Sequence, residues 1–213
     1  SEGERMVAEV PKSGDGKFRQ NSGPAVLHEK VGNHLLQVSQ RSFWQGHKRA
    51  PEVLTDVVSN FAEIKNGEHV LDLFGGVGLF TASSLEAVGS DGSIHLVEGS
   101  KDATSDAKNN FAGLTNVEIS TGDVAKIISL IQSADVVILD PPREGAGKDV
   151  VEQLARIGAR VIVYVACDPA ALARDTVYLA ESGYSLTKIR AFDLFPMTHH
   201  IESVAMFTPS KVS

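Results

Sequence analysis

Short apolar runs alternate with amphipathic segments along most of the chain, from about residue 49 to residue 207. The apolar runs are rich in Val, Ile and Leu, which is typical of strands buried on both faces. The segments between them carry apolar residues at the spacing of a helix. Strands are predicted at 69–73, 94–98, 117–120, 136–140 and 161–166, and helices at 79–87, 102–112, 124–131 and 149–157. This alternation predicts a parallel sheet with helices on both faces.

The pattern changes after residue 168. Pro169 opens a predicted helix that continues to about residue 182, and two further strands follow at 185–192 and 204–207. Their connection, DLFPMTHHIE, contains no segment of helix length, so the two strands are expected to be antiparallel to each other. The predicted fold is therefore a doubly wound α/β domain whose mostly parallel, seven-stranded sheet ends in an antiparallel hairpin.

The first 41 residues differ from the rest. They hold several Gly and Pro residues and only short apolar pieces, such as 7–10 and 35–38. Such pieces suit short strands and turns, and they are too few to bury a core. We expect residues 1–41 to be the remnant of another, β-rich domain. Residues 42–213 would form the main domain, with a first helix that starts near Pro51 and ends at Asn66-Gly67.

The composition is that of an ordinary globular protein, with 42% hydrophobic and 22% charged residues. No apolar run approaches the length of a membrane helix, and the first residues lack the apolar core of a signal peptide. The single cysteine excludes an internal disulfide and a cysteine-rich metal cluster, which suits a reducing compartment. We expect a cytoplasmic monomer. The net charge of −7 argues against a broad basic surface, but not against a local basic cleft.

A glycine-rich loop, DLFGGVG, follows the first strand of the predicted sheet and leads into a helix. Glycines let the backbone turn tightly and approach a ligand, and the helix start offers free amides. Gly75, Gly76 and Gly78 are not spaced as in the dinucleotide motif G-x-G-x-x-G. Asp72 stands at the strand end, where a carboxylate suits a ligand with a positive amino group. Taken alone, the loop fits a structural turn equally well.

Further acids follow the next two strands. Glu98 lies where a carboxylate can accept hydrogen bonds from a ribose diol, and Asp123 is placed to receive an adenine amino group. A ligand that combines an amino acid, a ribose and an adenine is S-adenosylmethionine. We therefore expect S-adenosylmethionine as the cofactor, with Asp72, Glu98 and Asp123 around it rather than as three solvated strand ends.

The last strand of the parallel core leads into Cys167. Ligands of open α/β sheets bind beyond the carboxyl ends of the strands, which favours a chemical role for the thiol. A free cysteine is also commonly a buried small hydrophobe. The charge of Asp168 opposes a thiolate and the following helix start favours one, although Asp168 as a helix cap would direct its charge to backbone amides. These alternatives stay open at this point.

Three segments resemble the RNA 5-methyluridine methyltransferases, the uracil-C5 family that acts on tRNA and 23S rRNA. They are DPPREG at 140–145, YVACDPAALARD at 164–175 and DLFPMTHHIESVAMF at 193–207. The usual family forms are DPPR-x-G, YVSCNPxTLARD and DMFPHTxHVExV. SFWQGH at 42–47 also resembles the family's Phe-Phe-Gln-x-Asn segment, so the resemblance covers about residues 42–207. It implies a class I, Rossmann-like methyltransferase domain that uses S-adenosylmethionine and has tRNA or rRNA as partner.

The resemblance also assigns roles to individual residues. Cys167 matches the family's nucleophile and Glu202 its general base. Arg143 and His200 are interpreted as substrate contacts. The alternative for Arg143 is an ordinary surface residue that contacts no substrate. The predicted cofactor contacts are Gln45, Phe74, Glu98, Asp123 and Asp140, which match family positions, together with Asp72, Gly76 and Gly78 from the loop.

The chain departs from the family's usual residues at four positions. Asp168 replaces Asn, Met197 replaces His, His47 replaces Asn, and Leu79 stands where many members have Asn. The family's N-terminal TRAM domain and most of its central domain are expected to be absent, as are the cysteines of the iron–sulfur cluster that some members hold. We expect the chain to bind the cofactor but to hold RNA weakly.

Methylation of uracil C5 needs a nucleophile and a base, because C5 itself reacts poorly with a methyl sulfonium. Addition of a thiolate to C6 makes C5 electron-rich, and removal of the C5 proton then allows the thiol to leave. Cys167 and Glu202 are this minimal set. A target base inside folded RNA must also be unstacked before it reaches the thiol.

Two other functions fit parts of the pattern. An amino-group methyltransferase would use DPP as in the [DN]PP[YF] motifs, but Arg143 replaces the aromatic residue and Cys167 then has no task. An inactive cofactor-binding module would dock on RNA or protein without needing Cys167 or Glu202. His199 and His200 beside Glu202 are possible metal ligands by type, but no third ligand has suitable spacing, so no metal is expected.

Overall fold

The computed structural model describes residues 7–9, 19–22, 24–195, 197–198 and 200–210. Its centre is a sheet in the order β10-β11-β9-β8-β5-β6-β7. The strands are β5 (His69–Leu73), β6 (Ser93–Glu98), β7 (Val117–Thr121), β8 (Val136–Leu139), β9 (Val161–Ala166), β10 (Tyr184–Phe192) and β11 (Glu202–Pro209). The helices are α1 (Ala50–Ala62), α2 (Leu79–Val88), α3 (Lys101–Asn110), α4 (Val124–Ile128), α5 (Lys148–Ile157) and α6 (Pro169–Glu181). None of the helices in this described part is long and apolar enough to cross a membrane.

The sheet combines a parallel core with an antiparallel end. β5 to β9 run parallel to one another. β11 lies between β9 and β10 and is antiparallel to both. The predicted doubly wound fold with a terminal hairpin is confirmed. The pattern of the sequence does not indicate that β11, rather than β10, adjoins the parallel core.

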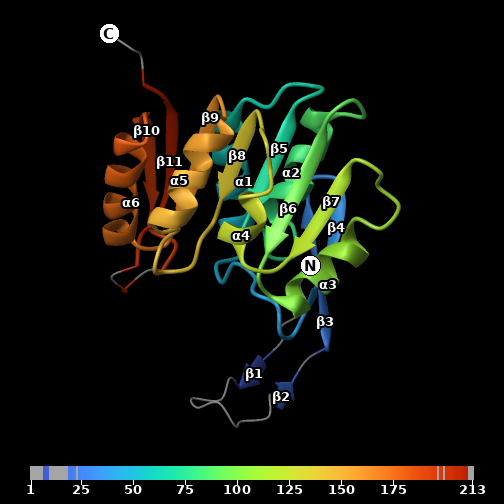
Figure 1. Cartoon of the computed structure of the whole chain (residues 1–213). Coiled ribbons are helices and arrows are strands. Elements are labelled where there is room, and N and C mark those ends of the chain that lie inside the picture. The colour runs from blue at the N-terminus through green and yellow to red at the C-terminus, as the bar shows by residue number, and fades with distance from the viewer. Residues whose placement is uncertain (1–6, 10–18, 23, 196, 199, 211–213) are drawn as a thin grey trace.

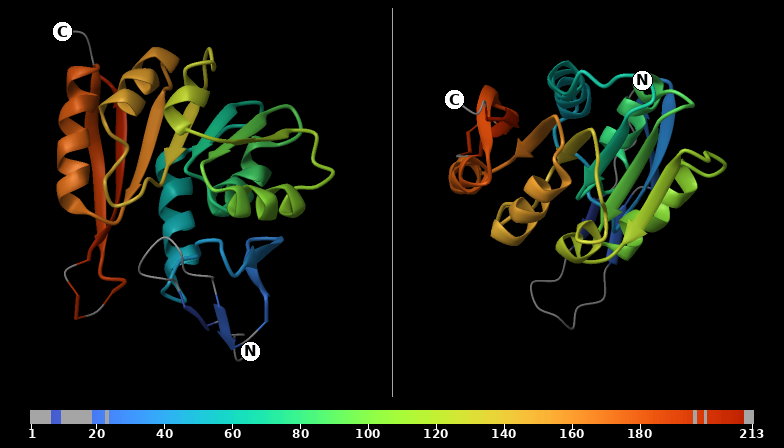
Figure 2. Two further views of the ribbon diagram at one scale, coloured as in Figure 1. Left: turned by 60° about the horizontal axis from the view of Figure 1, so that its bottom comes forward. Right: turned by 45° about the horizontal axis from the view of Figure 1, so that its top comes forward.

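Helices cover both faces of the sheet (Figures 1 and 2). α1, α2 and α3 lie on one face and α4, α5 and α6 on the other. The side chains of successive β9 residues pack alternately against these two helical layers. Val161, Val163 and Val165 join the buried apolar cluster that includes α1 and α2, whereas Ile162 and Tyr164 join the cluster that includes α5 and α6. Because both faces are covered, the strand has no polar face, which explains the unbroken apolar run in the sequence.

Two helices end earlier than predicted. α4 ends at Ile128 rather than residue 131, because Arg156 of α5 donates to the carbonyls of Ile128 and Ile131, each at 2.8 Å. α1 ends at Ala62 rather than at residue 66, because Glu63 adopts the left-handed conformation that closes a helix, with φ 43°. The other predicted elements of the main domain agree with the structure to within about two residues at each end.

Part of the predicted β-rich segment packs on the main domain. β3 (Val26–Val31) and β4 (His34–Ser39) form an antiparallel hairpin, and β1 (Val7–Glu9) pairs with β2 (Arg19–Ser22) in a separate sheet. Val31 and Leu36 of the β3–β4 hairpin are buried in the same cluster as α1 and α2. A domain boundary between residues 41 and 42 stays a prediction, but residues 26–39 share the core of the larger part.

Asp106 on α3 fastens this hairpin. Its side chain is 3% exposed, and its Oδ2 accepts hydrogen bonds from the Ser39 amide at 2.8 Å and the Ser42 hydroxyl at 2.6 Å. The Gln37 side-chain amide donates to Oδ1 at 3.4 Å. One carboxylate therefore fixes both the end of β4 and the start of the 42–47 segment.

Replacing Asp106 with alanine is expected to lower the free energy of unfolding by about 1–3 kcal/mol, because part-buried donors lose the buried carboxylate that accepts their hydrogen bonds. Equilibrium urea denaturation measures this change. Asp102→Ala on the same helix is the control, since Asp102 is half exposed and its ion pair with Arg41 spans 4.0 Å. We expect that control to lose less than about 1 kcal/mol. Equal losses in the two variants would contradict the anchoring role of Asp106.

Candidate active site

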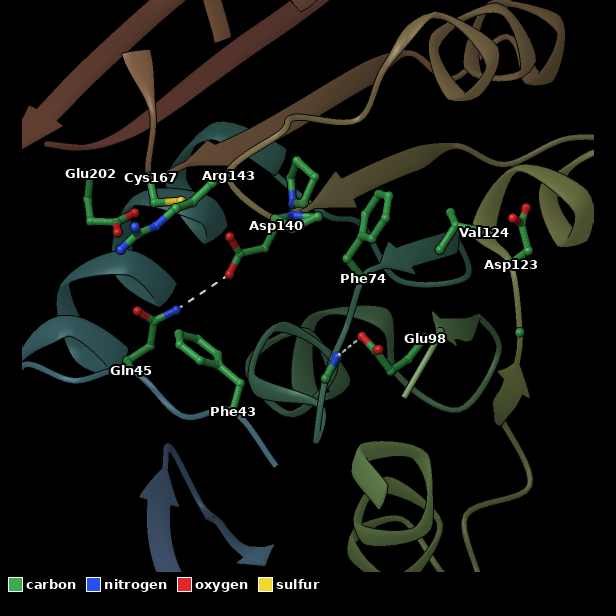
Figure 3. A pocket seen from close by; sticks show the side chains of 15 residues that line it. Phe43, Gln45, Phe74, Glu98, Asp123, Val124, Asp140, Arg143, Cys167 and Glu202 are labelled. Atoms are coloured by element: carbon green, nitrogen blue, oxygen red, sulfur yellow. Dashed lines mark hydrogen bonds between the residues drawn. The ribbon is translucent and has the colours of Figure 1, made fainter. Parts of the chain in front are cut away.

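A cavity of about 640 Å³ opens at the carboxyl ends of the parallel strands, within the usual size range of ligand sites (Figure 3). It is lined by Phe43, Gln45, Phe74, Gly76, Glu98, Gly99, Gly122, Asp123, Val124, Asp140, Pro141, Pro142, Arg143, Cys167 and Glu202. Both predicted catalytic residues and six of the eight predicted cofactor contacts therefore share one cavity.

The loop after β5 forms one wall of the cavity. Phe74 and Gly76 line it, with φ values of 58° and 56°. Glu98 at the end of β6 holds the loop, because its Oε2 accepts from the Gly76 amide at 3.1 Å and its Oε1 from the Ser100 amide at 2.6 Å. Each carboxylate oxygen has a second lone pair, so Glu98 can still accept a hydrogen bond from a ligand.

Asp72 and Gly78 lie behind this loop rather than on the cavity wall. Asp72 is 1% exposed, and its Oδ2 accepts from the amide and the hydroxyl of Thr81 at 2.8 and 2.6 Å. Gly78 has φ 100°, and a Cβ there would lie 2.2 Å from the Phe111 ring. The structure thus gives both residues a supporting role, and a direct cofactor contact by either one stays a prediction.

Asp123 lies at the opposite end of the cavity from Cys167 (Figure 3). Its Oδ1 accepts from the Lys126 amide at 2.9 Å and so caps the short helix α4. Val124, which is buried, adds an apolar surface beside the carboxylate. A carboxylate next to an apolar wall suits a flat ring that carries an amino group.

Cys167 and Glu202 meet across two paired strands. β9 ends at Ala166, which pairs with Ser203 of β11. In this antiparallel register the next opposed pair is Cys167 with Glu202. Both line the cavity, and Figure 3 shows them close together at one end of it. The strand register therefore brings a thiol and a carboxylate to the same end of the cavity.

Burial and acidic neighbours raise the pKa of the Cys167 thiol. Burial is the largest cause, followed by the charges of Glu202 and Asp140, while the Arg143 charge acts in the opposite direction. Burial also raises the pKa of Glu202. Burial, together with nearby carboxylates, raises the pKa of Asp140 well above its usual value. A cationic ligand among these groups would be stabilised by them and would favour the thiolate.

Asp168 is the N-cap of α6. Its Oδ1 accepts from the Ala171 amide at 2.8 Å, so its charge is directed to the helix start, as expected of a cap. The start of α6 favours a thiolate at the preceding residue. Burial and the neighbouring acids act in the opposite direction and raise the pKa of Cys167.

Arg143 and His200 lie together at the thiol end. Arg143 Nη2 is 3.4 Å from His200 Nε2, although His200 is not among the lining residues. On the same side, the Gln45 side chain donates to Asp140 Oδ2 at 3.4 Å. His199 lies outside the described residues. Within the described ranges, no group of three or more His, Cys, Asp or Glu side chains is arranged to hold a metal ion.

Several lining residues are not identified by the sequence reasoning. Phe43 is 71% exposed at the cavity, and its position two residues before Gln45 in SFWQGH was the available signal. Val124, Pro141 and Pro142 add apolar surface. An apolar residue next to a strand end has no signal that distinguishes a cavity wall from the core.

Residues 124–209 match the family model described as tRNA (Uracil-5-)-methyltransferase. A protein of Streptomyces avermitilis, named an uncharacterized RNA methyltransferase, is 42% identical over 198 residues, which cover 92% of this chain and 46% of that protein. A protein of the same name from Thermotoga maritima is 35% identical over 191 residues, 88% of this chain and 43% of that protein. The chain spans about half the length of these curated relatives.

Solved structures of methyltransferases share the fold. The tRNA (uracil-54, C5)-methyltransferase of Pyrococcus abyssi, in complex with S-adenosyl-L-homocysteine, gives a TM-score of 0.77 at 26% identity, over 93% of this chain and 48% of that one. A SAM-dependent methyltransferase of Aquifex aeolicus gives 0.57 at 18% identity, over 75% of this chain and 89% of the other. The second likeness shows the fold alone. The sheet is thus that of class I methyltransferases.

The buried acid Asp72 is expected to make stability depend on pH. Burial raises its pKa to about 6, against the effect of the hydrogen bonds from Thr81. Since this exceeds the unfolded value of about 3.9, the stabilising contribution is complete below about pH 4 and is lost as the pH rises through about 6. Relative to Asp72→Asn, the wild-type free energy of unfolding should fall by about 3 kcal/mol from about pH 4 to about pH 7.

Denaturant titrations of both proteins across this pH range measure the difference. Glu86→Gln, an exposed acid on α2, is the matched control and should follow the wild-type curve. A difference between wild type and Asp72→Asn that stays constant across the range would contradict a protonated Asp72 in the folded protein.

Proposed function

Because the chain belongs to the tRNA (uracil-5-)-methyltransferase family, we propose that it is the catalytic part of an enzyme that methylates C5 of a uridine in tRNA or rRNA. The observation that carries this proposal is that Cys167 and Glu202, each next to the paired residues Ala166 and Ser203, line the same end of an acid-lined cavity. Amino-group methylation would leave this pair without a task.

S-adenosylmethionine is the cofactor, and when bound it supplies an electrophilic methyl group. The residues of the cavity fit it. Glu98 offers acceptors for a ribose diol, and Asp123 offers one for an adenine amino group. Asp72 Oδ1 is buried behind the loop and has no hydrogen-bond partner within the described residues; a direct contact between it and the ligand's amino group stays a prediction. The surrounding carboxylates also favour a ligand with positive charge.

The thiol and the carboxylate divide the chemistry at the uracil ring. The Cys167 thiolate adds to C6, which forms a C6–S bond and moves the electron pair of the C5–C6 double bond into an enolate. C5 thereby becomes nucleophilic enough to be methylated. The Glu202 carboxylate then takes the C5 proton, the electron pair re-forms the C5–C6 double bond, and the C6–S bond breaks to release the thiolate.

Arg143 supports the first of these steps. It lines the cavity with Cys167, and its charge opposes the rise in the pKa of the thiol. The same charge can stabilise the enolate that develops on the uracil. His200, at 3.4 Å from the guanidinium, belongs to this end of the site.

RNA as partner, a monomeric state and a cytoplasmic location stay predictions. The curated relatives are about twice as long, so the activity and substrate of a longer protein are part of the proposal. The alternative is a cofactor-binding module that is inactive alone. Methyl transfer by this chain to bulk tRNA or rRNA would exclude that alternative.

Cys167→Ala is expected to reduce methyl transfer about a thousandfold or more, because the nucleophile is lost. Its affinity for S-adenosylmethionine should stay within about twofold of wild type, since the cofactor acids are untouched. A methyl-transfer assay on RNA and calorimetry with the cofactor measure the two effects. Full methyl transfer by this variant would rule out the thiol mechanism.

Glu202→Gln is expected to accumulate a covalent RNA–protein adduct, because the C5 proton cannot be removed and the C6–S bond persists. Mass spectrometry of the protein after nuclease digestion detects the added nucleotide. The double variant Cys167→Ala/Glu202→Gln is the control and should carry no adduct. Wild-type turnover by Glu202→Gln, without an adduct, would show that another group is the base.

A further inference from the structure

Asp175 on α6 is a buried acid that the proposed reaction does not use. Its side chain is 0% exposed, and it does not line the cavity. Its carboxylate accepts hydrogen bonds from the Tyr164 hydroxyl at 2.7 Å, the amides of Ala146 at 2.7 Å and Gly147 at 3.3 Å, and the Arg174 guanidinium at 2.7 Å. Removing such an acceptor leaves several donors unsatisfied, so the carboxylate is a rigid anchor.

This anchor is tied to the chain on both sides of the thiol. Tyr164 lies on β9, which ends one residue before Cys167, and Asp175 lies on α6, whose N-cap is the residue after the thiol. Burial and the hydrogen bond to Asp175 raise the pKa of Tyr164, so its hydroxyl stays a donor. The position of Asp175 relative to the thiol is therefore fixed by two elements.

The segment held by Asp175 is the turn that carries Arg143. The Gly145 amide donates to the Pro142 carbonyl at 2.8 Å, which closes a tight turn around Arg143. Arg174, itself bound to Asp175, donates to the carbonyl of the residue after Arg143 at 2.6 Å. The two amides that follow the turn bind Asp175 directly.

Gly145 shows how closely the turn approaches α6. It has φ 81°, and a Cβ there would lie 2.6 Å from Asp175 Oδ2 and 2.5 Å from Arg174 Nη2. Only glycine allows this approach without a shift of the turn or the carboxylate. The contact between the turn and α6 thus requires glycine at position 145 and the carboxylate of Asp175.

We propose that Asp175 is a positioning residue that fixes this turn and so holds the Arg143 guanidinium beside the Cys167 thiol. Figure 3 shows the side chains of Arg143 and Cys167 next to each other in the cavity. The contact of Arg143 with His200, at 3.4 Å, is long for a hydrogen bond and holds the guanidinium weakly. An effect of Asp175 on methyl transfer rests on the proposed function. Its effect on the pKa of the Cys167 thiol does not.

The thiol can report the position of Arg143, because the chain has one cysteine. The charged groups that act on it are Glu202, Asp140 and Arg143. Rates of alkylation by iodoacetamide, from about pH 6 to about pH 10, follow the thiolate fraction. Asp175→Asn turns an amide group toward one of the present donors and loosens the turn. We expect its alkylation near pH 8 to be about threefold slower, with the rate profile displaced upward by about 0.5 pH unit.

A combined variant separates positioning from general damage. Arg143→Gln should displace the profile by at least as much, and Asp175→Asn added to it should cause no further displacement. Asp149→Asn, an exposed acid in the first turn of α5, is the matched control and should keep the wild-type profile. A folded Asp175→Asn protein with the wild-type profile, or a displacement that persists in the Arg143→Gln background, would overturn the proposal.

Thermal unfolding checks that the variants are folded. If Asp175→Asn is not, Arg174→Gln tests the same anchor from its more exposed side, since the Arg174 side chain is 44% exposed. The same upward displacement is expected, and a wild-type profile would overturn the proposal.

Because alkylation needs no RNA, the role of Asp175 and the proposed function can be rejected independently of each other. A displaced profile in a chain that methylates no RNA would reject only the proposed function, whereas an active chain with an unmoved profile would reject only the role of Asp175.

Discussion

The antiparallel pairing of β11 with β9 is the constraint on which the site depends. Ala166 opposite Ser203 makes Cys167 and Glu202 the next pair, although they lie far apart in the sequence. A slip of one residue would turn Glu202 to the other face of the sheet. Burial of Phe207 among the residues of one helical layer resists such a slip, because every side chain of β11 would then face the wrong layer.

The strand order extends this pair into a cavity for a charged ligand. β8 and then β5 follow β9 in the sheet, so the acid after β8 and the loop after β5 lie progressively farther from the thiol. Burying several carboxylates around one cavity is unfavourable. It raises the pKa of Asp140 and of the Cys167 thiol. A ligand with positive charge would relieve this repulsion, so the same arrangement that strains the protein favours its cofactor.

The sequence predicts what depends on local pattern and misses what depends on partners distant in the chain. The parallel strands are predictable because both of their faces are apolar, and Glu98 because acids at parallel strand ends meet at one edge of a sheet. The early end of α4 depends on Arg156 of another helix. Likewise, no pattern shows that Asp72 turns toward Thr81 instead of the cavity. The anchoring by Asp175 needs a turn about thirty residues away, which only the tertiary structure brings to it.

The identity of the methylated atom is the most direct test of the central claim that this site methylates C5 of a uridine. RNA that carries deuterium at C5 of its uridines can be incubated with the chain and S-adenosylmethionine, digested to nucleosides and analysed by mass spectrometry. The product should be 5-methyluridine that has lost the C5 deuterium, since the base removes that atom before the thiol leaves. A methylated nucleoside that retains every C5 deuterium, such as an N-methylated base, would contradict it.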